Sequence, residues 1–432
     1  MSTDSSTDFQ GFAERLFRVE HGEWPRLLLA FSTFFLILGC WFMLRPIRGT
    51  VAANNSEILP WLYTATFTSM LFVVPVFGYL VARFPRRIFL PAVYFFFVAN
   101  ILLFAWLFRG EQTNVWIQRG FYVWASVFNL FVYSLFWSYM ADLFRSSQAQ
   151  RLFGSIMAGG SFGAMLGPLF TLHMASRIGS QGIMLVAAGV LTLATLLVIS
   201  MRRLTVPGRS KQAAQVIGGS IWEGARRVFR SRYLIFICLL MLAHNLTATF
   251  LYNGLAILVD QNIIGFDART EFFSYIDVAV QILAFAFQFF ITTRLLSYLG
   301  MPKTIIIIPL LLTGGMVLLG SALTVVLFAG VHVAQRALNY GMIGPTKEML
   351  FTVVDRETKY KCKNFIDTVV YRGSDVTASW AVKGLMGLGL TLSNIAWLLL
   401  PIMLVWSVIA WKLGRQYEQL KRYFESELPQ QA

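Results

Sequence analysis

Long apolar runs recur from one end of the sequence to the other, and they constrain the fold more than any other feature. A helix needs about 20 mostly apolar residues to cross the hydrocarbon core of a bilayer. Runs of this kind fall near 26–44, 60–82, 88–108, 120–141, 151–174, 182–201, 233–259, 271–293, 304–323, 324–344, 365–389 and 393–411. The ninth and tenth runs are nearly continuous. We therefore predict an all-α membrane protein with twelve transmembrane helices.

The composition agrees with a polytopic membrane protein and argues against a soluble one. Hydrophobic residues make up 57% of the 432 residues and charged residues only 13%. The formal net charge of +15 is typical of basic loops that contact anionic lipid, so we predict membrane lipids and no nucleic acid as partners. The three cysteines have no pairing or ligand spacing, and we interpret Cys40, Cys238 and Cys362 as packing residues.

One polar interval, residues 202–232, divides the apolar runs into six plus six. The predicted organisation is as follows: a cytoplasmic segment at 1–25, an N-terminal six-helix bundle at 26–201, a central cytoplasmic loop at 202–232, a C-terminal six-helix bundle at 233–411, and a cytoplasmic tail at 412–432. Two bundles of six helices are a common plan among secondary transporters.

The lysines and arginines between the runs predict the orientation. Most of the 36 basic residues lie in connections that are cytoplasmic if the N-terminus is cytoplasmic, and the opposite orientation would reverse the bias. We therefore expect a multi-pass protein of a bacterial inner (plasma) membrane with both termini in the cytoplasm. We expect it to act as a monomer.

Polar and ionisable side chains form stripes inside several of the spans. Such groups are costly in a bilayer and usually face a cavity or a partner. The predicted substrate-binding residues are Arg45, Arg48, Arg336, Tyr340, Arg372, Lys383, Asp277, Gln281, His244 and Asn245. We also expect Pro46 to loosen the helix at Arg45 and Arg48, and Gly341, Gly344 and Pro345 to break the tenth span.

The charges in these stripes predict an anionic substrate. Five basic side chains stand against two acidic ones, Asp277 and Asp375, and arginine suits bidentate contacts with phosphate or carboxylate. The two aspartates are the candidates for proton coupling, whereas exchange of anions needs no coupling ion. Each residue also has a structural interpretation: Arg45 and Arg48 at the headgroups, Arg372 paired only with Asp375, and His244 as a hydrogen-bonded core group.

A basic turn follows the second span of each half. The first, "GYLVARFPRR" at 78–87, resembles the loop signature of the major facilitator superfamily, and the resemblance implies that fold and a gating role for Arg83, Arg86 and Arg87. Ala82 stands where the signature has an acid and Pro85 where it has a glycine. The segment "GSIMAGGSFGAMLGPLF" at 154–170 resembles a glycine-proline motif of superfamily antiporters, but we interpret its glycines as helix-packing residues.

The stretch from Tyr340 to Arg372 resembles the ATP/ADP translocase family of nucleotide exchangers. The residues that fit are Tyr340, Pro345, Thr346, Lys347, Glu348, Met349, Asp355, Lys359, Lys361, Lys363, Asp367 and Arg372. "LRPIRGT" at 44–50 and "FWSYMADLFRSSQAQRLFG" at 136–154 resemble two further segments of that family. The resemblance implies transport of a nucleotide, and Lys347 with Glu348 is a candidate gate pair.

This sequence also departs from that family. Arg48 replaces a lysine and keeps its charge, but Gly49 replaces an aspartate and Gln148 an acid. The glutamate and lysine of the seventh span have no counterpart, because Ala248 and Tyr252 stand near those positions.

These observations predict a divergent secondary transporter for an anionic, phosphate-bearing solute such as a nucleotide, with exchange as one mode. The alternative is a lipid or lysophospholipid transporter of the same fold. Neither the four histidines nor the cysteines form a metal motif, and no phosphate-binding loop is present. We therefore expect no enzyme activity, no cofactor and no metal.

Overall fold

The computed structural model describes residues 19–20, 23–84, 86–109, 114–144, 146–201, 221–355, 358, 362–363 and 365–427. Every element of regular structure in these ranges is helical. Within them, nine helical segments are long and apolar enough to cross a membrane. The predicted fold class, an all-α membrane protein, is therefore confirmed, and the count of twelve spans stays a prediction.

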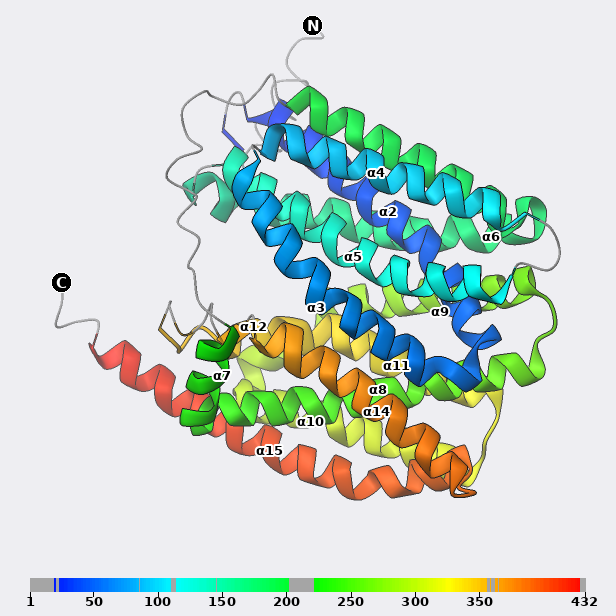
Figure 1. Ribbon diagram of the computed structural model, residues 1–432. Coiled ribbons are helices and arrows are strands. Elements are labelled where there is room, and N and C mark those ends of the chain that lie inside the picture. Colours follow the sequence, from blue (N-terminus) through cyan, green and yellow to red (C-terminus); the bar gives the residue numbers. More distant parts are fainter. Residues whose placement is uncertain are drawn as a thin grey trace, which may run out of the picture. The chain divides into compact units, whose positions relative to one another are not determined.

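The first part of the described chain holds five long helices and one short one (Figure 1). They are α2 (Trp24–Asn54), the 3-10 helix η1 (Ser56–Ile58), α3 (Leu59–Arg83), α4 (Arg86–Leu107), α5 (Val115–Leu143) and α6 (Ser146–Met201). Helix α2 continues through Pro46 for two more turns, so the expected loosening there does not end it. Helix α6 contains two of the predicted spans, which meet at Gly179, where φ is 64°. Glycine adopts this conformation without steric cost.

The second part begins with α7 (Ile221–Arg230), a helix that the prediction of a loop at 202–232 missed. It continues with α8 (Arg232–Asn262), α9 (Phe266–Ala286), the π-helix η3 (Phe287–Thr292), α10 (Thr293–Ser321), α11 (Val325–Leu338), the π-helix η4 (Asn339–Ile343), α12 (Gly344–Leu350), the π-helix η5 (Ile366–Val370), α14 (Tyr371–Gly387) and α15 (Leu392–Glu427). The predicted break at Gly341, Gly344 and Pro345 is wrong. The helix widens into η4 there and continues into α12, because Gly344 keeps helical dihedral angles.

The chain packs into two compact units. Unit 1 comprises Met1–Val51, Thr68–Val216 and Gly265–Val278, and unit 2 comprises Ala52–Phe67, Ile217–Ile264 and Ala279–Ala432. Each unit thus takes one short segment from the other half of the sequence. These units describe packing, and the topological boundaries predicted from the sequence stay predictions.

A stripe of glycines fixes the packing of α2 and α6 in unit 1. A Cβ atom would lie 2.6 Å from the Phe31 carbonyl oxygen if built at Gly159, and 2.1 Å from the Phe35 oxygen if built at Gly163. At Gly167, one turn further on, it would lie 2.6 Å from the carbonyl oxygen of Gly39. The steps of four residues on both helices mean that α2 and this part of α6 run parallel in direct backbone contact. The packing interpretation is therefore confirmed for Gly159, Gly163 and Gly167, whereas a Cβ at Gly154 would meet nothing within 4 Å.

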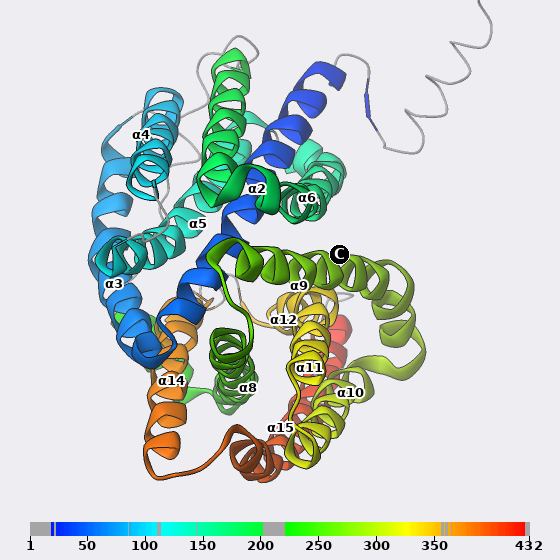
Figure 2. The same ribbon diagram turned by 90° about the vertical axis from the view of Figure 1, so that its right-hand side faces the viewer.

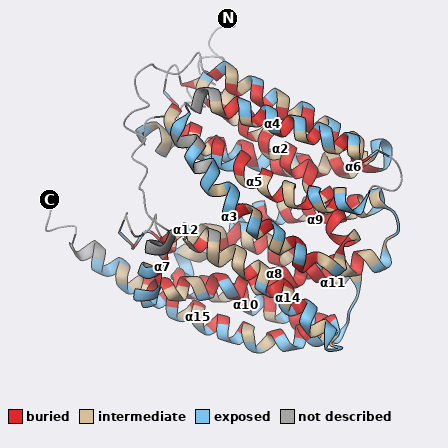
Figure 3. Ribbon diagram, viewed as in Figure 1, coloured by how far each residue is buried: buried red, intermediate tan, exposed pale blue. Residues whose placement is uncertain are grey.

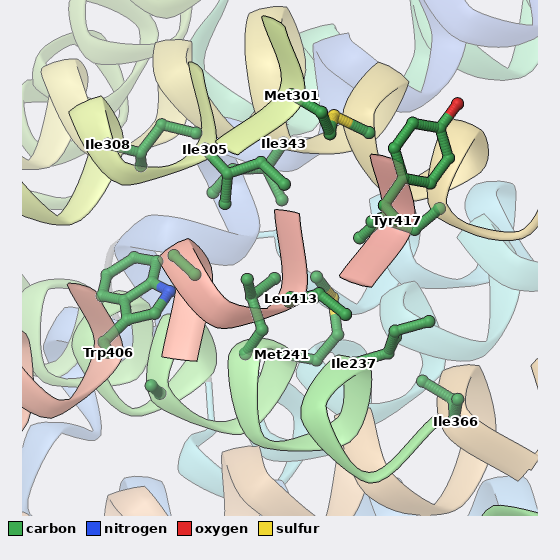
Figure 4. Close-up of a cluster of buried hydrophobic side chains, with 14 of the residues drawn as sticks. Ile237, Met241, Met301, Ile305, Ile308, Ile343, Ile366, Trp406, Leu413 and Tyr417 are labelled. Carbon is green, nitrogen blue, oxygen red and sulfur yellow. The ribbon is translucent and has the colours of Figure 1, made fainter. Parts of the chain in front are cut away.

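In unit 2, α8 lies in the interior of the bundle. Figure 2 shows it between α14 and α11, and both helices contact it. Most of α8 is buried, as Figure 3 shows, whereas less than half of α15 is buried. A hydrophobic cluster joins these helices (Figure 4): Ile237 and Met241 of α8 lie with Trp406 and Leu413 of α15 and Ile305 of α10. This core holds the polar residues of α8 in fixed positions.

Candidate functional site

Arg45 of α2 forms an ion pair with Asp277 of α9 in unit 1. Their Nη1 and Oδ1 atoms are 3.5 Å apart, and the side chains are 19% and 4% exposed. The guanidinium also lies 5.4 Å from the centre of the Phe42 ring. Sequence analysis placed both charges in one site, and the structure brings them together although they come from opposite halves of the sequence.

Arg48 lies one helical turn beyond Arg45 and is held by α5. Its guanidinium carbon lies 3.9 Å from the centre of the Tyr122 ring, and its Nε donates to the Ser126 hydroxyl at 3.1 Å. The Ser126 hydroxyl in turn donates to the Tyr122 carbonyl oxygen at 3.0 Å. The plane of the guanidinium is therefore fixed from two directions, and the side chain remains partly exposed.

A chain of small polar groups fixes the segment that carries Asp277. The hydroxyls of Thr50 and Thr270 are 2.8 Å apart, and that of Ser180 lies 3.4 Å from Thr270. Ser180 also donates to Asp267 from its hydroxyl at 2.7 Å and from its backbone N–H at 3.0 Å. Three elements, α2, α6 and α9, are thereby joined about two helical turns before Asp277 on α9.

Glu23 forms a buried carboxylate site immediately before α2. Its side chain accepts hydrogen bonds from Gln148 at 2.8 Å and from Arg151 at 3.2 Å, and the backbone N–H of Glu20 donates to it at 3.0 Å. Burial raises the pKa of the Glu23 carboxyl, but the bonds from Glu20, Gln148 and Arg151 outweigh burial and hold its pKa below the ordinary value of 4.5. Sequence analysis missed this site, because Gln148 was noted only as a lost acid.

Replacing Glu23 with glutamine should lower stability at neutral pH and flatten its dependence on acid. A carboxyl with a lowered pKa stabilises the fold above its unfolded value and loses that contribution as the pH falls through the folded value. The contribution is thus present above about pH 4.5 and declines below it. Hydrogen bonds to a charged group are worth about 1.5–3 kcal/mol. Thermal unfolding at pH 6 and pH 3.5 measures this difference.

Glu20→Gln is the control, because the Glu20 side chain is 72% exposed in its ion pair with Arg151 and should contribute little. Equal losses in both variants, or an unchanged acid response in Glu23→Gln, would contradict the role given to Glu23.

A ladder of hydrogen bonds joins α8 to α14 in unit 2. Asn245 donates to the Ser374 hydroxyl at 2.9 Å, and Thr249 donates to Asp375 at 3.2 Å. One turn further along α8, Asn253 donates to Ser379 at 2.8 Å. The steps of four residues place all three donors on one face of α8. Sequence analysis named residues on both helices and did not predict that they pair.

Asn253→Ala should destabilise the protein by about 0.6–1.7 kcal/mol, which is the usual range for a hydrogen bond between transmembrane helices. The substitution removes the amide that pairs with Ser379. Asn262→Ala is the matched control, because Asn262 bonds only a carbonyl of its own helix at 2.8 Å. Thermal unfolding of both variants in detergent gives the comparison. A loss for Asn262→Ala as large as that for Asn253→Ala would contradict the importance of the ladder.

Arg336 lies on α11 next to two π-helical segments. Its Nη2 donates to the Tyr340 hydroxyl at 3.1 Å, as their spacing of four residues predicts. The Thr292 hydroxyl of η3 donates to the carbonyl oxygen of Gly341 in η4 at 2.7 Å. A Cβ at Gly341 would lie 2.6 Å from that of Phe287, so η3 and η4 pack directly on each other.

The basic residues of α14 have local partners. Arg372 lies 3.6 Å from Asp375, and the predicted pair is therefore present. Lys383 donates to the Glu57 carbonyl oxygen at 3.0 Å. Trp380 donates to the Thr64 hydroxyl at 3.1 Å. The beginning of α3 and the preceding turn are thus attached to α14.

Lys347 and Glu348, the predicted gate pair, do not bond each other among the described contacts. Lys347 pairs with Asp367, and Glu348 pairs with Lys363 at 2.6 Å. The two pairs attach α12 to Asp367 in η5 and to Lys363. Adjacent residues on a helix point in different directions, which explains why each finds its own partner. Their gating role stays a prediction.

The remaining predicted residues divide as follows. Arg83 donates to Tyr79 on an exposed surface, and the side chains of Arg86 and Arg87 lie outside the described residues. His244 is 2% exposed and its ring lies 5.8 Å from that of Trp406. Unit 1 contains Arg45, Arg48 and Asp277, and unit 2 contains His244, Asn245, Gln281, Arg336, Tyr340, Arg372, Asp375 and Lys383.

Comparison with known proteins identifies the architecture. A family model described as Major Facilitator Superfamily matches residues 27–346, and no curated protein sequence matches significantly. Among solved structures, the nucleoside transporter NupG is 14% identical with a TM-score of 0.62, and the match covers 92% of this chain and 99% of that one. A D-xylose-proton symporter is 16% identical with a TM-score of 0.61 and coverages of 90% and 97%.

The POT family transporter PepTSo is 10% identical with a TM-score of 0.61, and the match covers 93% of this chain and 99% of that one. At these identities the solved structures show the fold alone. The family model covers well over half of the sequence, and all three structures are transporters. The chain therefore belongs to the major facilitator superfamily, and it is a secondary transporter rather than an enzyme.

Proposed function

We propose that this transporter carries an anionic, phosphate-bearing solute such as a nucleotide, and that Arg48 is its principal contact in unit 1. The observation that carries the proposal is the fixed guanidinium: Tyr122 lies under its face at 3.9 Å and Ser126 accepts from its Nε at 3.1 Å. A guanidinium held in this way loses little freedom when it binds. Its planar fork suits the paired oxygens of a phosphate.

The charges around Arg48 support an anion at this place. Arg45 lies one helical turn before Arg48 on α2, and one buried carboxylate, Asp277, lies against Arg45. Charges in a medium of low dielectric constant are costly unless they are compensated. A phosphate group at this place would be attracted by both guanidinium groups.

Unit 2, considered by itself, holds buried hydrogen-bond acceptors. Asn245 Oδ1, Asn253 Oδ1 and Gln335 Oε1 are buried and have no hydrogen-bond partner among the described residues. Buried polar atoms are nearly always paired. A solute with hydroxyl and amino groups that bound in unit 2 would provide donors for them.

Two similarities to known transporters agree with this proposal. The solved structures of this fold include one titled a nucleoside transporter, and the stretch from Tyr340 to Arg372 resembles the ATP/ADP translocases. We propose further that transport proceeds by exchange, with Asp277 engaged by Arg45 rather than serving as a proton site. The lysophospholipid alternative shares the anionic headgroup and differs in the apolar tail.

A ligand panel tests the substrate class. A ligand that binds the folded state raises the melting temperature by mass action. We expect ATP and ADP to raise the melting temperature of the purified protein more than adenosine, inorganic phosphate or D-xylose do. A shift with lysophospholipid alone would favour the lipid alternative, and no shift with any phosphate compound would contradict the proposal.

A further inference from the structure

Helix α7 carries a surface for which the transport mechanism gives no role. Helix α7 ends at Arg230, and α8 begins two residues later at Arg232. Figure 1 shows that the axis of α7 is turned away from that of α8. Four arginines fall within the seven residues 226–232. A helix that crosses the end of a transmembrane helix lies near the plane of the membrane surface.

One side of α7 is anchored to unit 2. Val228 is 2% exposed and belongs to the hydrophobic cluster of α8 and its neighbours. Arg227 donates to the Thr358 hydroxyl at 2.8 Å. The backbone N–H of Thr358 donates to Asp355 at 2.8 Å, and this bond lowers the pKa of the Asp355 carboxyl. These contacts keep the helix in one orientation.

The other side of α7 is exposed and combines cations with an aromatic ring. Arg226, Phe229 and Arg230 are spaced i, i+3 and i+4, so they share one face. All three are exposed, and Phe229 is 73% exposed. Arg232, the first residue of α8 and two residues after the end of α7, is also exposed. An exposed phenylalanine among arginines is unfavourable in water and favourable at the boundary between headgroups and acyl chains.

We propose that α7 binds the anionic surface of the membrane leaflet at which α8 begins. Arg226, Arg230 and Arg232 contact lipid phosphates, and Phe229 inserts between the headgroups. The occupant is a bilayer rich in anionic phospholipid, because the positive charge and the apolar ring are presented together on one face. The same contact steadies the bond between Arg227 and Thr358. This inference does not depend on the substrate proposed above.

The test compares anionic and zwitterionic lipid with the full-length protein. Nanodiscs of phosphatidylcholine receive increasing fractions of phosphatidylglycerol, and the melting temperature reports binding. Phosphatidylglycerol should stabilise the parent protein, with a smaller effect at high salt because the contact is electrostatic. Arg226→Gln/Arg230→Gln should need roughly thirtyfold more phosphatidylglycerol for the same shift, since two surface arginines at about 1 kcal/mol each are removed.

Three variants act as controls. Arg109→Gln/Arg177→Gln removes two exposed arginines of unit 1 and should keep the parent response. Arg226→Lys/Arg230→Lys should also keep most of it, because the charge remains. Phe229→Ser should weaken the response while leaving the melting temperature in pure phosphatidylcholine unchanged.

Two outcomes would overturn the proposal. The first is a full phosphatidylglycerol response in Arg226→Gln/Arg230→Gln, which would place the lipid elsewhere. The second is an equal shift with soluble glycerophosphate, which would mean that a headgroup binds without the bilayer.

Discussion

Replacing Gly163 with alanine should destabilise the protein strongly, by about 1–3 kcal/mol or more, as overpacking of a close contact does. The added methyl group would lie 2.1 Å from the Phe35 carbonyl oxygen, and no rotamer change can relieve a clash with backbone. Helices α2 and α6 would have to separate, and α2 carries Arg45 and Arg48. The melting temperature and the fraction of monodisperse protein after purification measure the effect.

Gly189→Ala is the matched control on the same helix. A Cβ at Gly189 meets nothing within 4 Å, so this change should be neutral or stabilising, since alanine favours a helix by about 0.5–1 kcal/mol over glycine. If the Gly163→Ala and Gly189→Ala proteins had the same melting temperature, the claim that α2 and α6 are in direct backbone contact would be contradicted.

Arg48→Ala should weaken binding of a phosphate-bearing ligand at least tenfold. Loss of a charge-assisted hydrogen bond costs about 1.5–3 kcal/mol, and each 1.4 kcal/mol changes affinity tenfold. Arg48→Lys should lose less, because it keeps the positive charge and loses only the stacked plane over Tyr122 and the bond to Ser126. Ligand titration of each purified variant, across a salt series, gives the affinities.

Arg119→Ala provides the comparison for Arg48→Ala. Arg119 also lies over an aromatic ring, that of Trp116, at 4.6 Å, and it has no role in the proposed site. The affinity of the Arg119→Ala protein for ATP should match that of the parent protein. Unchanged affinity in a folded Arg48→Ala protein would make Arg48 a structural residue and remove the anion site.

Local spacing in the sequence was sufficient to predict contacts along single helices. The pair Arg372–Asp375 was predicted from a step of three residues, and the packing role of Gly163 and Gly167 from a step of four. The bond between Arg336 and Tyr340 has the same local spacing, although it was not predicted. The apolar runs predicted the helical membrane fold, because their length is set by the thickness of a bilayer.

Contacts between distant helices could not be predicted in this way. The sequence placed Asp277 and Arg45 in one cavity, but only the folded chain shows that they pair. The same holds for Lys347, whose partner is Asp367 rather than its neighbour Glu348. Glu23 was missed because its three donors, Glu20, Gln148 and Arg151, come from two separate segments. A rule based on residue spacing predicts contacts only within a single helix.

The substrate is best tested by exchange in proteoliposomes. Vesicles that contain the purified protein and unlabelled ATP are placed in labelled ADP, beside vesicles without internal nucleotide and vesicles with Arg48→Ala. We predict rapid uptake in the ATP-loaded vesicles, little uptake in the empty ones, and a severe loss in Arg48→Ala. If the folded parent protein took up neither ADP nor any other phosphate compound, and moved a neutral solute instead, the proposed anion transporter would be contradicted.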